Sequence, residues 1–336
     1  MSLSSRSAFL TVIISAAAFA VAVLGLLIGA KPMTLAEALT ALASPNQGTD
    51  GIIVWTLRMP RSIAAFLAGG ALAVSGFLLQ SITRNPLAAP DLTGVSSGAV
   101  AAIVSTFVFL PAISSFYYPA IGMAGGLAAA SMTVWVARGG RASALHTALG
   151  GITVALFLNA ITTYVLLRGG PQSPSVLFWL SGGFQGRSWP QIMYMLPWII
   201  SGLAVALASH RVLGVLALGD EVAAGMGVNL SVWKSLLMLA AIGLVAGVTP
   251  VAGPVAFVGL AAPHLVRLLH PRDSFWSLML NIAIGGGLLV TADVLARSVA
   301  APREIPVSIF TALIGGPIFI YLAQRRETSM GRGALA

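Results

Sequence analysis

The feature that most constrains this chain is the length of its apolar stretches, several of which could cross a membrane without carrying a charged side chain. Only 8% of the 336 residues are charged and 57% are hydrophobic, whereas a soluble globular domain carries about 25% charged residues. A soluble core cannot absorb this much apolar surface, so lipid must solvate most of the chain. Because a lipid-exposed backbone must satisfy its own hydrogen bonds, the sequence predicts an all-α integral membrane protein.

About ten transmembrane helices are expected, since each needs about 20 apolar residues. Pro111 and Pro119 divide one long charge-free stretch into two helices. The first stretch could be a signal peptide, but its apolar core exceeds the roughly 7–15 residues of such a leader, so we interpret it as a helix that remains. The expected spans are 7–30, 61–84, two between 91 and 138, 142–167, 190–209, 233–250, a short one at 255–268, 274–296 and 306–323.

The distribution of basic residues predicts the orientation of the chain. Ten spans place both termini on one side, which receives eleven of the 18 lysines and arginines. The positive-inside rule therefore favours cytoplasmic termini, although seven basic residues on the outer side is a high number. The basic residues are scattered singly, which argues against nucleic acid as a partner. No long linker or soluble segment is present, so residues 1–336 are expected to form a single transmembrane domain. There is no cysteine.

The longest inner connection contains "LALGDEVAAGMGVNLSVWK" (216–234). Asp220 and Glu221 suit the start of a short helix, and Gly225 and Gly227 permit a sharp turn after it. Spacing alone favours an ordinary loop over a helix that docks a soluble partner, by about two to one, since loops with Gly and Asp are common.

The stretch "GLVAGVTPVAGPVAFVGLAAPHLVR" (243–267) predicts broken helices, because its three prolines cannot lie within two regular long ones. Broken backbone at membrane depth persists only where it is buried in protein or borders a wet cavity. Gly243 and Gly247 form a small-residue contact face. The alternatives are close packing and a moving element of a transporter. His264 has no second ligand at metal-binding spacing, so a packed or interfacial histidine is expected.

Three further places carry charge in an apolar setting. Asp293 and Arg297 lie four residues apart; a proton relay is an alternative, but a structural ion pair is the safer interpretation. Arg58 and Arg61 flank a proline at an outer helix mouth and could engage an acidic partner. The turn "RNPLAAPDLTGVSSGA" (84–99) ends one helix, and either of two residues within it could cap the next, namely Asp91 or Thr93.

The sequence also excludes several functions. Its two lysines, Lys31 and Lys234, belong to no phosphate-binding G-x-x-x-x-G-K-[ST] loop. No Ser-His-Asp set, HExxH motif or paired-carboxylate site is present, so no catalytic residue, no resident cofactor and no metal site are predicted.

Together, several motifs resemble a known family. "LRMPRSIAAFLAGGALAVSGFLLQSITRNPLAAPDLTGVSSGA" (57–99), "PVAGPVAFVGLAAPHLVRLL", "TADVLAR" and "EIPVSIFTALIGGPIFIYL" are similar, in this order, to the BtuC/FecCD-type permeases of type II ABC importers, which import iron–siderophore complexes and cobalamin. The resemblance covers about residues 10–325 and implies the BtuC-like ten-helix fold. Two departures stand out: "HPRDSFW" (270–276) has Ser274 and Phe275 where His-Arg is usual, and Ser308 stands where Gly is usual.

The resemblance implies roles for particular residues. The segment 216–232 would contain the coupling helix that seats in an ATPase. Arg58, Arg61 and Arg297 would meet glutamates of a binding protein, and Asn85 and Leu87 would form a cytoplasmic gate. The coupling residues implied are Asp220, Glu221, Ala223, Ala224, Gly225 and Gly227.

The resemblance also implies partners. These are two cytoplasmic ATPase subunits that bind ATP and Mg²⁺, a second permease subunit that is identical or homologous, a periplasmic or lipid-anchored substrate-binding protein, and the lipid of a bacterial inner membrane. The expected function is import of an iron chelate, foremost a ferric siderophore. Cobalamin or haem import is an alternative within the family. A stand-alone proton-coupled transporter that uses Asp293, and a membrane scaffold without transport, are alternatives of other classes.

Overall fold

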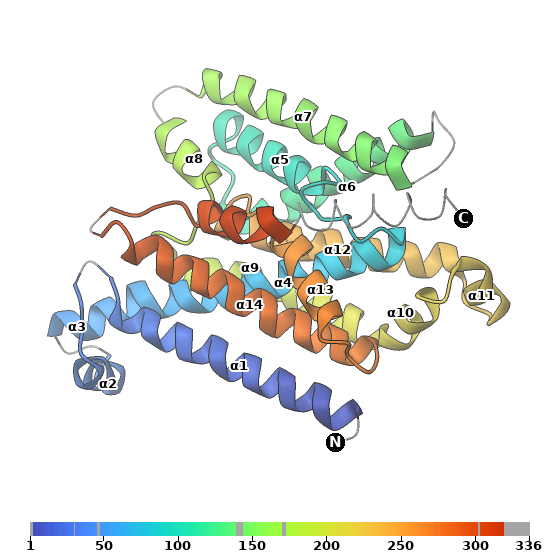
Figure 1. Cartoon of the computed structure of the whole chain (residues 1–336). Helices are drawn as coiled ribbons and strands as arrows, with labels where there is room; N and C mark the ends of the chain where they lie inside the picture. Colours follow the sequence, from blue (N-terminus) through green and yellow to red (C-terminus); the bar gives the residue numbers. More distant parts are fainter. Residues whose placement is uncertain are drawn as a thin grey trace.

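The computed structural model describes residues 3–29, 31–45, 48–138, 144–169, 173–301 and 303–318, and every regular element in these ranges is a helix (Figure 1). A π-helical turn, Ile53–Arg58, joins α3 to α4, a 3-10 turn at Ser115–Tyr117 precedes α6, and an apolar helix, Val307–Ile318, follows α14. The α-helices are α1 Leu3–Leu27, α2 Leu35–Ala43, α3 Gly48–Ile52, α4 Met59–Thr83, α5 Val95–Phe109, α6 Tyr118–Arg138, α7 Ala144–Arg168, α8 Ser173–Leu180, α9 Trp189–Ala208, α10 His210–Leu216, α11 Asp220–Gly225, α12 Leu230–Ala252, α13 Val258–Leu268 and α14 Ser274–Ser298.

The described helices match the ten expected spans. Seven are long and apolar enough to cross a membrane, and these include α1, α4, α6, α7, α9, α12 and α14. Three shorter apolar helices, α5, α13 and Val307–Ile318, take the remaining positions. The end of the expected tenth span, beyond residue 318, lies outside the described residues. The long helices run across the view of Figure 1, with α2, α3 and α8 at one end, here called the α2 end, and α10 and α11 at the other, the α11 end.

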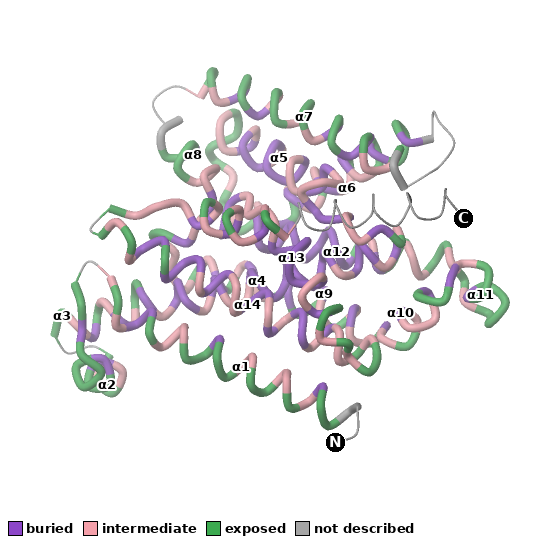
Figure 2. The backbone as a smooth tube through the Cα atoms, in the orientation of Figure 1, coloured by how far each residue is buried: buried purple, intermediate pink, exposed green. Residues whose placement is uncertain are grey.

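Three helices form the centre of the bundle. Of the apolar windows, 78% is buried in the α4 span, 72% in α12 and 67% in α14, against 11% in α1. Figure 2 shows the corresponding concentration of buried backbone in the middle and exposed residues along α1 and α7. The chain therefore keeps its small and apolar residues inside and offers large apolar side chains to lipid on the outer helices.

Glycines set the distance between the central helices. A Cβ atom built on Gly76 of α4 would lie 1.8 Å from the carbonyl oxygen of Gly259 in α13, and one built on Gly69 would lie 2.2 Å from that of Gly285 in α14. The expected contact face in α12 is present at Gly247, where a Cβ atom would lie 2.6 Å from Trp198 of α9. Helix α4 thus touches two neighbours backbone to backbone.

The predicted break after α12 is present. Helix α12 includes Pro250 and ends at Ala252, after which Gly253 adopts a φ of +68°. Residues 253–257 are not helical, and α13 begins after Phe257, whose φ is +69°. Gly253 is required on steric grounds as well, because a Cβ atom there would lie 2.2 Å from the carbonyl oxygen of Trp179. The start of the broken segment therefore packs against α8 at Trp179.

Candidate functional site

The segment predicted to dock a partner folds as a short helix that projects from the α11 end (Figure 1). Helix α11 is six residues long. It is preceded by Gly219, with φ +119°, and followed by Gly227, with φ +83°. Both backbone angles favour glycine. The side chain of Asn229 then accepts a hydrogen bond from the amide of Val232 at 3.2 Å and caps α12. The glycines and the cap fix where α11 starts, stops and turns back.

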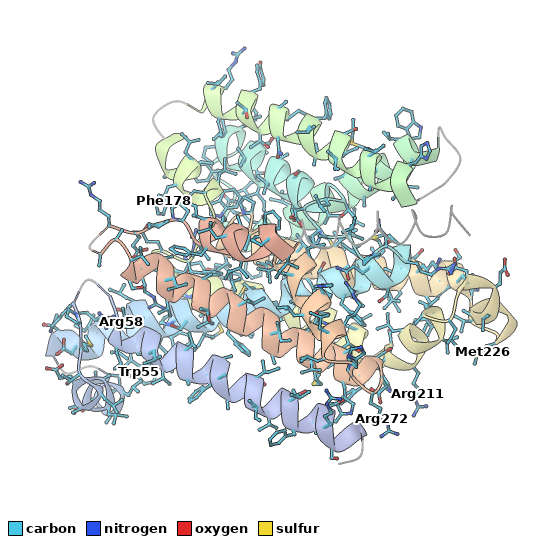
Figure 3. All side chains as sticks on the ribbon, viewed as in Figure 1. Trp55, Arg58, Phe178, Arg211, Met226 and Arg272 are labelled. Carbon is cyan, nitrogen blue, oxygen red and sulfur yellow. The ribbon has the colours of Figure 1, made fainter. Side chains whose placement is uncertain are left out.

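Much of this segment is exposed. Glu221, Ala224, Gly225 and Gly227 lie on its surface, whereas Ala223 is completely buried and holds α11 against the bundle. Sequence reasoning missed three large apolar side chains that are also exposed here, Leu218, Val222 and Met226, the last of which is labelled in Figure 3. Their signal was available, since apolar residues in a connection between two membrane spans have no lipid to face. Exposed apolar side chains gathered on a projecting helix favour contact with another protein.

Asp220 is an internal anchor of the segment. Its carboxylate accepts a hydrogen bond from Lys234 Nζ at 2.6 Å and lies 3.6 Å from Arg84 Nη2. The hydrogen bond from Lys234 holds the pKa of Asp220 below its ordinary value, helped by the charges of Lys234 and Arg84. Asp220 therefore joins α11 both to α12 and to the turn that follows α4.

That turn, 84–94, is closed by its own polar groups. Arg84 takes a left-handed conformation, with φ +49°, and ends α4. Asn85 is buried, and its Oδ1 accepts a hydrogen bond from the amide of Leu87 at 3.1 Å; Leu87 itself is half-buried. These contacts fix the two residues that were predicted to form a gate at the α11 end, next to the anchor of α11.

The prediction that Asp91 or Thr93 caps α5 is wrong. The cap residue is Gly94, with φ +80° and no side-chain hydrogen bond to the helix. Asp91 Oδ2 instead accepts a hydrogen bond from the amide of Phe257, at 3.4 Å, across the break before α13. The Thr93 hydroxyl donates to the carbonyl of Pro90. A left-handed glycine makes the entry to α5 by itself, which leaves the carboxylate to stabilise the broken backbone.

A cavity of about 820 Å³ lies beside the break. Residues 254–256 border it, as expected for irregular backbone at membrane depth. Ser308 also lines it and donates a hydrogen bond to the carbonyl of Pro254 at 3.2 Å, which gives this departure from the family pattern a local role. Most of the lining is apolar. Its polar groups are the carboxylate of Asp91 and a set of hydroxyl and amide side chains, namely Ser96, Ser97, Asn159, Thr162, Thr163, Ser181 and Ser308. The polar residues of α7 were missed, although Asn159, Thr162 and Thr163 interrupt an otherwise apolar span.

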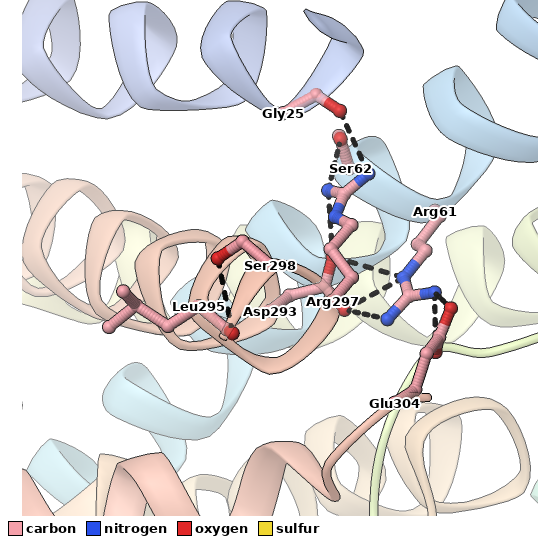
Figure 4. A network of polar contacts seen from close by, with 8 residues as sticks. All are labelled: Gly25, Arg61, Ser62, Asp293, Leu295, Arg297, Ser298 and Glu304. Carbon is pink, nitrogen blue, oxygen red and sulfur yellow. Dashed lines mark hydrogen bonds and ion pairs between the residues drawn. The ribbon is translucent and has the colours of Figure 1, made fainter. Parts of the chain in front are cut away.

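The α2 end holds a buried ion-pair network (Figure 4). Asp293 is fully buried. Its carboxylate accepts a hydrogen bond from Arg61 Nε at 2.8 Å and forms an ion pair with Arg297 Nη2 at 2.8 Å. Arg61 Nη1 also pairs with Glu304 at 2.9 Å. Arg297 donates further to the carbonyl of Gly25 at 2.9 Å and to the hydroxyl of Ser62 at 3.1 Å. The structural ion pair expected between Asp293 and Arg297 is confirmed. The network as a whole connects α14, which holds this pair, to α4 and α1.

The three arginines predicted to dock a binding protein have little free surface. Arg58 is 7% exposed, Arg61 8% and Arg297 5%. Arg58 ends the π-helical turn and donates to the carbonyls of Leu26 and Lys31, where α1 ends. All three guanidinium groups are therefore committed to partners within the chain. Docking through them stays a prediction, and it requires an incoming carboxylate to exchange with partners already present.

At the α11 end, the other departure from the family pattern also has a structural role. Asp273 caps α14 by accepting a hydrogen bond from the amide of Trp276 at 3.1 Å. Phe275 packs edge-on against His210, with 5.9 Å between ring centroids, so it joins α14 to α10. Among the residues that the structure describes, no three His, Cys, Asp or Glu side chains lie close enough to hold a metal ion.

The architecture defines the class of protein: a multi-pass helical membrane protein with a broken helix beside a large cavity and a short exposed helix, α11, at one end. The chain belongs to the FecCD transport family, whose sequence model matches residues 16–325. This family is the membrane permease component of ABC importers.

Relatives of known function support this assignment. The chain is 37% identical over 302 residues to the Fe(3+)-citrate import system permease protein YfmD of Bacillus subtilis (strain 168), covering 90% of each chain. It is 35% identical to the ferric enterobactin transport system permease protein FepD of Escherichia coli (strain K12), covering 90% of this chain and 91% of the relative. It is 38% identical to the cobalamin import system permease protein BtuC of Halobacterium salinarum, covering 85% and 78%.

The fold matches a solved structure of the same kind. A metal-chelate type ABC transporter in an inward-facing conformation superposes with a TM-score of 0.79 at 25% identity, covering 94% of this chain and 99% of that one. The expected BtuC-like fold is therefore confirmed.

Proposed function

We propose that this chain is the permease subunit of an importer that carries an iron chelate, foremost a ferric siderophore, across a bacterial inner membrane. The observation that carries the proposal is the cavity of about 820 Å³ beside broken helices, whose mostly apolar lining is dotted with polar side chains, in a chain whose relatives include iron-citrate and enterobactin permeases. Hydroxyl and amide groups give a bulky chelate many weak contacts, which suits passage better than tight binding.

The cavity belongs to one subunit, and we propose that a second permease, identical or homologous, completes the path. Two cytoplasmic ATPase subunits, which hold ATP and Mg²⁺, bind α11 and its neighbours. The exposed residues Leu218, Val222 and Met226 supply apolar contact, and Asp220 passes movement of α11 to the turn that contains Asn85 and Leu87. In this arrangement the α11 end and both termini are cytoplasmic, and Asn85 and Leu87 gate the inner exit.

At the α2 end we propose that a periplasmic or lipid-anchored substrate-binding protein docks. Arg58, Arg61 and Arg297 contribute by exchange, since their present partners occupy them. Glu304 is the partner best placed to be displaced, because its side chain is 24% exposed whereas that of Asp293 is fully buried.

One experiment tests the transport function. The chain is reconstituted in vesicles with its ATPase, second permease and binding protein, and uptake of ferric siderophore, cobalamin and haem is measured with and without ATP. We expect ATP-dependent uptake of one ferric chelate. Cobalamin import is the second candidate, because a 38% identical relative is a cobalamin permease. Uptake by the isolated chain without ATP would refute the proposal.

A matched pair of variants tests the docking helix. Val222→Asp places a charge on the exposed apolar face of α11, and Leu39→Asp makes the same change on an exposed leucine of α2 at the opposite end. We expect Val222→Asp to weaken co-purification with the ATPase and Leu39→Asp to leave it unchanged. Equal co-purification of both variants would remove α11 from the interface.

The proton-coupled alternative depends on Asp293, and the contacts of this residue argue against it. A proton carrier must release its partners in turn, whereas Asp293 is fully buried and bridges two arginines. This geometry supports a role as counter-ion that holds three helices together.

A further inference from the structure

One basic residue at the α2 end has no partner of its own. Five others there are explained by ion pairs, carbonyl contacts or an aromatic neighbour, and Arg303 is exposed to solvent. The five are Lys31, paired with Asp50; Arg58, on carbonyls near the end of α1; Arg61 and Arg297, in the ion-pair network; and Arg168, against the ring of Tyr164. The remaining one is Arg187, just before α9.

Arg187 is a largely buried cation without a counter-charge. Its Nε is buried and has no hydrogen-bond partner, and no hydrogen bond or ion pair joins its side chain to any residue that the structure describes. Burial lowers the pKa of Arg187, and no neighbouring charge offsets this. Burying the Nε without a partner is unfavourable, and the two Nη groups have no protein partner among the described residues, so the arrangement favours a ligand that supplies the missing charge.

The guanidinium borders a pocket of about 250 Å³ that is separate from the large cavity and shares no lining residue with it. Its walls come from α5, α6, α8, α9 and α12 and are mostly apolar, including Phe107 and Trp179. Trp179 is fixed by a hydrogen bond from its Nε1 to the carbonyl of Pro250 at 3.2 Å. The wall is therefore preorganised, and an apolar body can lie against it.

The polar groups of the pocket are suited to donate hydrogen bonds. Tyr118 and Tyr194 present hydroxyls, and Gln191 contributes an amide whose Oε1 already accepts hydrogen bonds from the Ser188 amide and hydroxyl, at 3.1 and 2.6 Å. The Nε2 of Gln191 is left to donate. No aspartate or glutamate lines the pocket. A set of donors around one cation, without an acid, has the chemistry of an anion site.

We propose that this Arg187 pocket binds an anionic group, a phosphate or a carboxylate, that is carried on an apolar body. The guanidinium can hold such a group with two parallel hydrogen bonds, and the aromatic side chains are typical of the depth at which lipid headgroups lie. A phospholipid headgroup and a soluble organic anion are the two sources of this chemistry. The site is independent of the transport path.

The test measures binding to the purified full-length protein in uncharged detergent. Short-chain phosphatidylglycerol is titrated against wild type, Arg187→Gln and the matched control Arg168→Gln, an exposed arginine at the same end. A diacylglycerol with the same chains serves as the ligand that lacks phosphate. Inorganic phosphate is added as competitor, and retained ligand is counted by native mass spectrometry. Arg187→Gln leaves no other side chain unpaired, so the variant is expected to fold.

We expect wild type and Arg168→Gln to retain phosphatidylglycerol and not diacylglycerol, and Arg187→Gln to bind about tenfold more weakly or worse. Competition by inorganic phosphate would identify a soluble anion as the source, and lack of competition would identify the lipid. Ser115→Trp, at the exposed rim, should also weaken binding by narrowing the mouth. Unchanged binding by Arg187→Gln, an equal loss in Arg168→Gln, or equal retention of diacylglycerol would overturn the proposal.

Discussion

Asp293→Asn is the substitution whose effect follows most directly from the structure. The change removes one negative charge from a fully buried position and keeps nearly the same volume and one acceptor oxygen. Two guanidinium groups depend on that charge. Arg61 retains Glu304 at 2.9 Å, but Arg297 retains only neutral partners, the Gly25 carbonyl and the Ser62 hydroxyl. The loss therefore falls mainly on Arg297.

The magnitude follows from this difference. Breaking a buried ion pair by removing one partner costs about 3–5 kcal/mol, because an uncompensated charge is left behind. Glu304 keeps one of the two arginines neutralised, so we expect the lower end, about 3 kcal/mol. The control is Asp50→Asn, which breaks the pair with Lys31 at the same end. The side chain of Lys31 is 54% exposed and that of Asp50 35%, so water screens the pair and the expected cost is about 0–1 kcal/mol.

The assay is unfolding of the purified protein in mixed micelles, with the two variants compared under one set of conditions. A double variant, Asp293→Asn with Arg297→Gln, removes both charges and should recover most of the loss, since neutral amides can hydrogen-bond to each other and to Ser62. If Asp293→Asn destabilised the protein no more than Asp50→Asn, the network would not hold the helices together and our reasoning would be wrong. Failure of the double variant to recover stability would show that charge compensation is not the cause.

Three further predictions address the α11 end and the central helices. Asp220→Asn should lower the protection of the amides of residues 220–227 against hydrogen exchange. The pKa of Asp220 is lowered in the folded state, so the anchor contributes above the ordinary carboxyl range and is lost as pH falls through the lowered value; wild-type protection, measured relative to the intrinsic exchange rate at each pH, that stays constant down to acidic pH would contradict this. Gly76→Ala would place a Cβ atom 1.8 Å from the carbonyl oxygen of Gly259 and should destabilise the protein by about 1–3 kcal/mol or more, whereas Gly225→Ala, with no atom within 4 Å, should not; equal unfolding midpoints would count against the close contact. Leu87→Arg should leave membrane insertion intact and alter uptake, and wild-type uptake would make the turn a plain connection.

Some of the candidate site could be predicted from sequence because its signals are local. Proline, glycine and hydropathy act over a few residues, so the break after Pro250 could be placed in advance. At 220–225 local spacing favoured an ordinary loop over a docking helix, and it was the family resemblance that implied a coupling helix there. Which side chains of α11 face the bundle and which face outward was harder to predict. Ala223 is buried and Val222 exposed, and this depends on how α11 rests on the bundle, which no local pattern specifies.

The sequence by itself determined that the chain is helical, spans a membrane many times and breaks near residue 253, because lipid requires long apolar segments with self-satisfied backbones. Only the tertiary structure decided which charges meet. Arg61 and Asp293 are separated by 232 positions, yet they form one ion pair. Asp220 joins α11 to Lys234 and Arg84, and Arg187 has no side-chain partner among the residues that the structure describes. Which charged side chains form ion pairs depends on which helix ends lie next to each other. The hydrophobic periodicity along the chain does not specify these neighbours.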